Sequence, residues 1–206
     1  SPLRPTEDLG WKHGFPHMTA IPADLVVIGV VRDARDWARS MHAKPWHCPP
    51  EMQRMDFADF IRAEWRTIAD RKRYFPQVAA LGGDGQPLQH DRDPLTGRPF
   101  ANLFALRRAK LSGLLSFRER GCAFVLTRLE AVQAAPEPFL AALHDGLRVT
   151  APDAPYRPVM KRLGSKFLPS VDNRPATPDR LKAADLAFLR AETDPAQEAA
   201  LGYGPY

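Results

Sequence analysis

The sequence predicts an α/β fold in which a parallel sheet is flanked by helices and connected by proline-rich loops. Two short apolar runs, 25–31 and 122–126, are typical of buried strands. Helix-forming stretches follow each run and also lie between them, an alternation typical of α/β folds with parallel sheets. The chain holds 21 prolines in 206 residues, about twice the usual frequency, which favours long ordered loops and excludes an extended all-helical bundle.

The run over 25–31 predicts a strand that leads directly into a helix. Its residues are continuously apolar rather than alternating, so we expect this strand to be buried on both faces. Asp33 precedes a helix-forming stretch that reaches His42, and its carboxylate is expected to cap that helix. A strand, a short turn and a helix in this order form the basic unit of an α/β fold.

Apolar spacing and proline or glycine stops predict the rest of the chain. Phe60 and Trp65 stand at helical spacing with other apolar residues, and together with Trp37 they are expected in the core. Residues 1–206 are predicted to form one domain, because no internal boundary is evident. In chain order we expect a loop over 44–52, a helix over 55–74, a loop over 82–99, a helix over 100–118, a helix over 138–146, an irregular proline-rich segment over 150–178 and a helix over 181–189.

Composition narrows the class of protein. Apolar residues make up 44% and charged residues 26%, which indicates a folded globular chain rather than a disordered one. Cys48 and Cys122 are the only cysteines, so a disulfide-dense secreted scaffold is excluded. No apolar run approaches the roughly 20 residues of a membrane span, and the first residues lack a signal-peptide layout. We therefore expect a cytoplasmic protein without a membrane span.

The charge balance favours anionic partners without naming one. The formal net charge is +5, a small excess for a chain of this length. The basic stretch of Arg107, Arg108 and Lys110 has no interleaved aromatic residues. We interpret it as a solvated helix face, and nucleic acid is not an expected partner.

Two segments carry residues suited to group transfer. Lys12 and His13 place a cation beside an imidazole that titrates near neutral pH, the pairing that general-base catalysis with charge stabilisation requires. The alternative is an ordinary surface pair in a loop.

Arg32 and Ser40 form the second candidate group. Arg32 ends the first predicted strand, where open α/β sheets bind ligands, and Ser40 lies two turns along the following helix. An arginine and a hydroxyl near a helix amino terminus can hold an anion. Alternatively, Arg32 pairs with Asp33 or Asp36, and Ser40 faces solvent.

In order and spacing, these segments resemble those of PAPS-dependent sulfotransferases of bacterial type. Members of that family place a Lys-(Thr)-His-x-Pro segment before a strand, and the strand runs into an arginine followed at the same interval by a serine. Here the matching stretches are 11–16 and 32–40. Further stretches, 124–132 with its following helix, 102–110 and 201–203, are similar to a later strand, a helix and the tail of such proteins.

The resemblance implies a P-loop-like three-layer fold and transfer of a sulfuryl group from PAPS to a hydroxyl or amine of an acceptor. It implies that His13 is the general base and that Lys12 stabilises the transferring sulfate. It also implies that Arg32 and Ser40 hold the 3′-phosphate of PAPS and of the product adenosine 3′,5′-bisphosphate. The acceptor would be a small molecule or a glycan, and such transfer needs no metal. Three more residues match the segment that closes over the same phosphate: Lys161, Arg162 and Gly164.

The sequence also departs from that family. No Gly- and Ser/Thr-rich phosphosulfate loop precedes Lys12, so the first strand of the fold and its anion-binding loop are expected to be missing from this chain. The usual Lys-Thr-His spacing is contracted to adjacent Lys12 and His13. The alternative function is therefore a non-catalytic protein of the same fold that binds an anion or a partner. His42, Trp46 and His47 either line an acceptor pocket or are ordinary loop residues.

Overall fold

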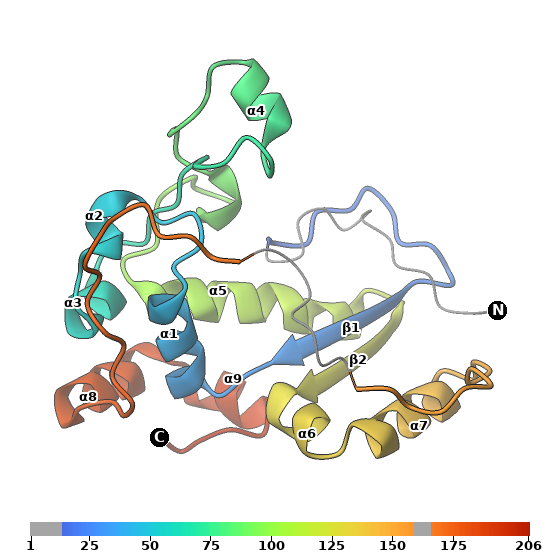
Figure 1. Cartoon of the computed structure of the whole chain (residues 1–206). Helices are drawn as coiled ribbons and strands as arrows, with labels where there is room; N and C mark the ends of the chain where they lie inside the picture. The colour runs from blue at the N-terminus through green and yellow to red at the C-terminus, as the bar shows by residue number, and fades with distance from the viewer. Residues whose placement is uncertain (1–13, 159–165) are drawn as a thin grey trace.

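A two-stranded parallel sheet lies at the centre of a mostly helical α/β fold (Figure 1). The computed structural model describes residues 14–158 and 166–206. Within them, β1 (Val26–Val31) pairs with β2 (Ala123–Arg128) along their full lengths. The predicted parallel sheet and its two strands are thus confirmed.

The two faces of β1 differ in exposure. Val27 and Val31 are buried beneath α5 (Leu103–Leu115), and a Cβ on Gly29 would stand only 3.0 Å from the side chain of Leu114. Ile28 and Val30 point the other way and are 42% and 55% exposed. The expectation of burial on both faces is wrong, because α5 covers one face only.

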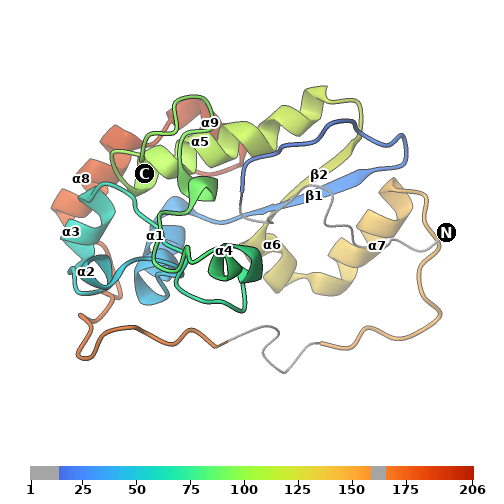
Figure 2. The ribbon, with the colours of Figure 1, turned by 90° about the horizontal axis from the view of Figure 1, so that it is seen from above.

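The three-layer P-loop-like fold implied by the resemblance is not formed by the described residues. Their sheet has only two strands. Figure 2 shows α5 along one side of this sheet, with α6 (Leu129–Ala134) and α7 (Pro136–Gly146) along the other. Neither α6 nor α7 has a buried residue, so this second side is thinly covered.

Helix α1 (Ala34–Ala43) begins where the sequence predicts it. The Asp33 carboxylate accepts a hydrogen bond from the Arg35 backbone N–H at 2.9 Å, which confirms Asp33 as the cap. At the other end of the helix, His42 is buried and lies 2.7 Å from the Thr177 hydroxyl. Burial lowers the pKa of His42, which favours its neutral form, so this histidine is part of the core rather than of a pocket.

The helix predicted over 55–74 is wrong for most of its length. Helix α3 (Phe57–Arg62) is short. Beyond it, the backbone N–H of Trp65 donates to the backbone carbonyl of Phe100 at 2.8 Å. Phe60 and Trp65 are nevertheless both buried, as predicted. Hydrogen bonds to a distant segment override the local helical pattern here.

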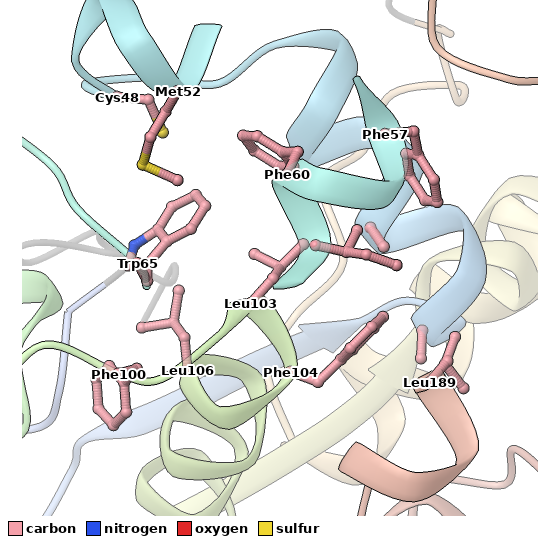
Figure 3. Packing of buried hydrophobic residues seen from close by; sticks show 13 residues of the cluster. Cys48, Met52, Phe57, Phe60, Trp65, Phe100, Leu103, Phe104, Leu106 and Leu189 are labelled. Carbon is pink, nitrogen blue, oxygen red and sulfur yellow. The ribbon is translucent and has the colours of Figure 1, made fainter. Parts of the chain in front are cut away.

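The main hydrophobic core lies between α1, α3, α5 and α8 (Ala183–Glu192) (Figure 3). Phe104 of α5 is fully buried and its ring stands 6.0 Å from that of Phe188. Trp37 packs against the edge of this core. By joining α1 to α5, the core fixes the position of the strand end that precedes α1.

The remaining elements are short, and the loop predictions are largely confirmed. The described parts of 150–178 contain no helix or strand, whereas the loop predicted over 44–52 runs into a short helix.

No helix within residues 14–158 and 166–206 is long and apolar enough to cross a membrane. The other elements are α2 (Pro50–Gln53), α4 (Pro76–Ala80), η1 (Gln89–Asp91), η2 (Ser116–Glu119) and α9 (Pro195–Ala200).

Candidate functional site

The C-terminal tail, residues 201–206, lies against the carboxyl ends of β1 and β2. The Tyr203 hydroxyl donates at 2.6 Å to Glu130, which stands two residues after the end of β2. The Gly202 carbonyl accepts from the Arg128 guanidinium at 3.0 Å. Polar side chains from the strand ends, α5, α9 and the tail thus meet at one edge of the sheet. We call this group the strand-end network; it comprises Asp33, Arg107, Glu130, Glu198, Tyr203 and Tyr206.

The backbone amides at the start of α1 are engaged within the protein. The Asp33 N–H donates to Glu130 at 3.1 Å, and the Ala34 N–H donates to the Tyr206 hydroxyl at 3.3 Å. The next amide, that of Arg35, bonds the Asp33 carboxylate. An anion at this helix start would therefore have to be held by side chains.

A buried ion pair underlies the network. Arg107 donates from two nitrogens to the Glu198 carboxylate, at 2.6 and 2.9 Å, and the two side chains are only 4% and 3% exposed. Arg107 also donates to the backbone carbonyl of Arg32 at 2.9 Å. The interpretation of Arg107 as part of a solvated helix face is thus wrong, since this side chain ties α5 and α9 to the end of β1.

Arg32 follows β1 directly and is half-buried. Asp33 is paired with Arg35 at 2.8 Å, and Asp36 is paired with Arg39 at 3.0 Å. Among the described residues, the guanidinium of Arg32 has no hydrogen-bond or ion-pair partner. The alternative in which Arg32 pairs with Asp33 or Asp36 is therefore not what the structure shows.

The other predicted site residues are only partly placed. Ser40 is exposed on α1. Arg32 and Ser40 both belong to the β1–α1 unit. The remaining candidates lie outside the described residues: Lys12, His13, Lys161, Arg162 and Gly164.

Hydrogen bonding shifts the pKa values of Glu130 and Tyr203 in opposite directions. Burial acts to raise the pKa of Glu130, but bonds from the Tyr203 hydroxyl, from its own backbone N–H and from the Asp33 amide outweigh it and hold this pKa below its ordinary value. Burial and the bond to Glu130 both raise the pKa of Tyr203. At neutral pH the pair is therefore a neutral phenol donating to a charged carboxylate.

Acid is expected to weaken the fold through Glu130. Because its folded-state pKa is lowered, its contribution is present above the unfolded value of about 4.5 and is lost as the pH falls through the folded value. Between about pH 7 and about pH 3, the thermal midpoint of Glu130→Gln should fall less than that of the unaltered chain. Glu119→Gln, which changes an exposed glutamate, should behave like the unaltered chain. Equal acid sensitivity of Glu130→Gln and the unaltered chain would contradict this assignment.

A second polar pair lies in the proline-rich loop. The Nδ1 atom of His47 is 2.6 Å from a carboxylate oxygen of Asp70, and the His47 backbone has a φ of 63°, unusual for a residue with a side chain. Its ring packs against Tyr74 and Phe75, with centroids 5.6 and 5.0 Å away. His47 is therefore held firmly in one orientation beside Asp70.

Sequence reasoning missed most of the strand-end network. Glu198 and Tyr206 carried no recognisable signal, and Tyr203 was noted only through the similarity of the tail to bacterial sulfotransferases. Glu130 accepts the Asp33 amide from the neighbouring strand end, a contact between residues far apart in the sequence that local spacing does not indicate.

Comparison with known proteins finds no match for this chain among family models, curated proteins or solved structures.

Proposed function

We propose that this chain transfers a sulfuryl group from PAPS to a hydroxyl or amine of a small-molecule or glycan acceptor. The observation that carries the proposal is the guanidinium of Arg32, which has no partner among the described residues and stands at the carboxyl end of a parallel strand. That end is where ligands of open α/β sheets bind. A guanidinium without a competing carboxylate is suited to a phosphate.

The surroundings of Arg32 support this role. Arg107 holds the backbone carbonyl of Arg32, and Arg35 occupies the Asp33 carboxylate. The acid next to Arg32 in the sequence is thus paired with another cation, which leaves the charge of Arg32 for a ligand. The exposed hydroxyl of Ser40 would provide a second contact to the same 3′-phosphate.

PAPS would supply the sulfuryl group. In this proposal His13 accepts the proton of the acceptor hydroxyl, and Lys12 stabilises the negative charge that develops during transfer. Lys161, Arg162 and Gly164 would close over the 3′-phosphate. The proposal includes a P-loop-like three-layer fold, in which a further layer would cover the open face of β1 at Ile28 and Val30.

The alternative is a non-catalytic protein of the same fold that binds an anion or a partner. The same exposed Ile28 and Val30 favour it, because apolar side chains on a parallel sheet are normally covered. Within this alternative, the engaged amides at the start of α1 favour a partner over an anion, since they offer no backbone donors to an anion.

Replacing Arg32 with alanine is expected to weaken binding of adenosine 3′,5′-bisphosphate by roughly 10- to 100-fold, the effect of losing hydrogen bonds to a charged group. Isothermal titration calorimetry at fixed salt measures this directly. Arg118→Ala is the matched control, because it removes the same charge from an exposed residue before the amino end of β2. It should leave binding unchanged.

The outcomes separate the two functions. Equal binding by the unaltered chain and Arg32→Ala would contradict the phosphate role of Arg32. Binding lost in Arg32→Ala, together with sulfuryl transfer that is abolished in His13→Ala, would support the enzyme. Binding with the same dependence on Arg32, but with no transfer to hydroxyl or amine acceptors, would favour the non-catalytic alternative.

A further inference from the structure

The peptide group that joins Arg32 to Asp33 is bound at both ends by side chains from distant parts of the chain. Its carbonyl accepts a hydrogen bond from Arg107 of α5 at 2.9 Å, and its N–H donates to Glu130 at 3.1 Å. The preceding residue, Val31, is held in the pairing of β1 with β2. Because a peptide group is planar and rigid, the backbone of Arg32 is thus fixed on both sides.

Two tyrosines of the C-terminal tail hold the side chains that bind this peptide group. The Tyr203 hydroxyl donates to Glu130 at 2.6 Å. The Tyr206 hydroxyl donates at 2.8 Å to Glu198, the buried partner of Arg107. The Tyr206 hydroxyl also accepts the first N–H of α1, at 3.3 Å. Each hydroxyl therefore acts on the turn between β1 and α1, either directly on its backbone or through a carboxylate.

The tail that carries both hydroxyls is itself anchored in the fold. Leu201 is 5% exposed and belongs to the same hydrophobic cluster as Val31. The Gly202 carbonyl accepts a hydrogen bond from the Arg128 guanidinium at 3.0 Å. The tail is therefore held at the carboxyl ends of both strands, and this placement suits a fixed role better than one that requires its release.

We propose that Tyr203 and Tyr206 are positioning residues for Arg32. They hold the backbone at Arg32 in one conformation, so that its guanidinium, which has no partner among the described residues, needs little further ordering to bind a phosphate. This inference rests on the proposed function, because it assigns the tail to the same phosphate site. The opposite interpretation is a tail that blocks an anion from the start of α1, and it predicts the reverse effect of removing a hydroxyl.

Calorimetric titration of the full chain with adenosine 3′,5′-bisphosphate tests this role. Tyr203→Phe and Tyr206→Phe each keep the ring and remove only the hydroxyl. Each should weaken binding by roughly three- to tenfold, the effect of having to order one more group when the ligand binds. Tyr74→Phe is the matched control, because it removes the hydroxyl of a 36% exposed tyrosine outside the strand-end network. It should leave binding unchanged.

The same substitutions in an Arg32→Ala background separate positioning from a general effect on the fold. If the tyrosines act through Arg32, Tyr203→Phe and Tyr206→Phe should cause no further loss of binding in that background. Losses of equal size with and without Arg32 would overturn the positioning role. Tighter binding by Tyr206→Phe would overturn it as well, because the tail would then be a blocking element.

The positioning role and the function on which it rests can fail separately. If Arg32→Ala binds more weakly while both tyrosine variants bind like the unaltered chain, only the positioning role is wrong. If Arg32→Ala binds like the unaltered chain, or the unaltered chain does not bind the nucleotide, the phosphate site and the positioning role are both wrong.

Discussion

Arg107→Ala is expected to lower the free energy of unfolding by about 3–5 kcal/mol, the usual cost of leaving one half of a buried ion pair unpaired. The Glu198 carboxylate would lose both hydrogen bonds from the guanidinium while remaining buried. The Arg32 carbonyl would lose its donor as well. Urea denaturation followed by circular dichroism measures the change.

The neighbouring Arg108 offers a matched control. It pairs with Glu192 at 3.2 Å, but the two side chains are 39% and 29% exposed. Solvent-exposed pairs contribute about 0–1 kcal/mol, so Arg108→Ala should have a small effect. Replacing both members of the buried pair, Arg107→Met with Glu198→Leu, should recover much of the stability lost in Arg107→Ala. Similar losses from Arg107→Ala and Arg108→Ala would show that the buried pair is unimportant for stability.

Phe104→Ala is expected to cost about 3–5 kcal/mol, because it removes a fully buried ring and leaves a cavity between α5 and α8. The adjacent ring of Phe188 would lose its partner at 6.0 Å. The same denaturation experiment reports this loss, and the slope of the transition should stay unchanged if the fold is retained.

Leu81→Ala is the control for the core substitution. Leu81 is 88% exposed, so its truncation should change stability by less than about 0.5 kcal/mol. If Phe104→Ala were as mild as Leu81→Ala, the core described between α1, α3, α5 and α8 would not be the one that stabilises the chain.

Features that depend on neighbouring residues were predictable from the sequence. The run over 25–31 becomes β1 because its side chains favour a strand, and Asp33 caps α1 because its carboxylate reaches an amide two residues on. The placement of Arg32 at the strand end follows from these two facts alone. Local pattern thus accounts for the β1–α1 unit, the part of the candidate site with the clearest chemistry.

Features that depend on distant residues were not predictable. The Tyr206 hydroxyl accepts a hydrogen bond from the Ala34 amide, and the Glu198 carboxylate accepts one from Arg107. Local sequence patterns do not predict such contacts between distant residues. The backbone at Trp65 is not helical, because its N–H bonds the Phe100 carbonyl, against what the local helical periodicity predicts. The side chain of Trp65 was correctly expected in the core.

The pairing of β1 with β2 also sets the order in which the chain can fold. Val26 pairs with Ala123, so closing the sheet brings together residues nearly a hundred positions apart. Closing this long loop costs conformational entropy before the hydrogen bonds between β1 and β2 can contribute any stability, whereas the helices need only local contacts. We therefore expect docking of the two strands to be a late and slow step. Until it occurs, the backbone groups of both strands are unpaired, and the apolar side chains of β1 make this the period in which the chain is most prone to aggregate.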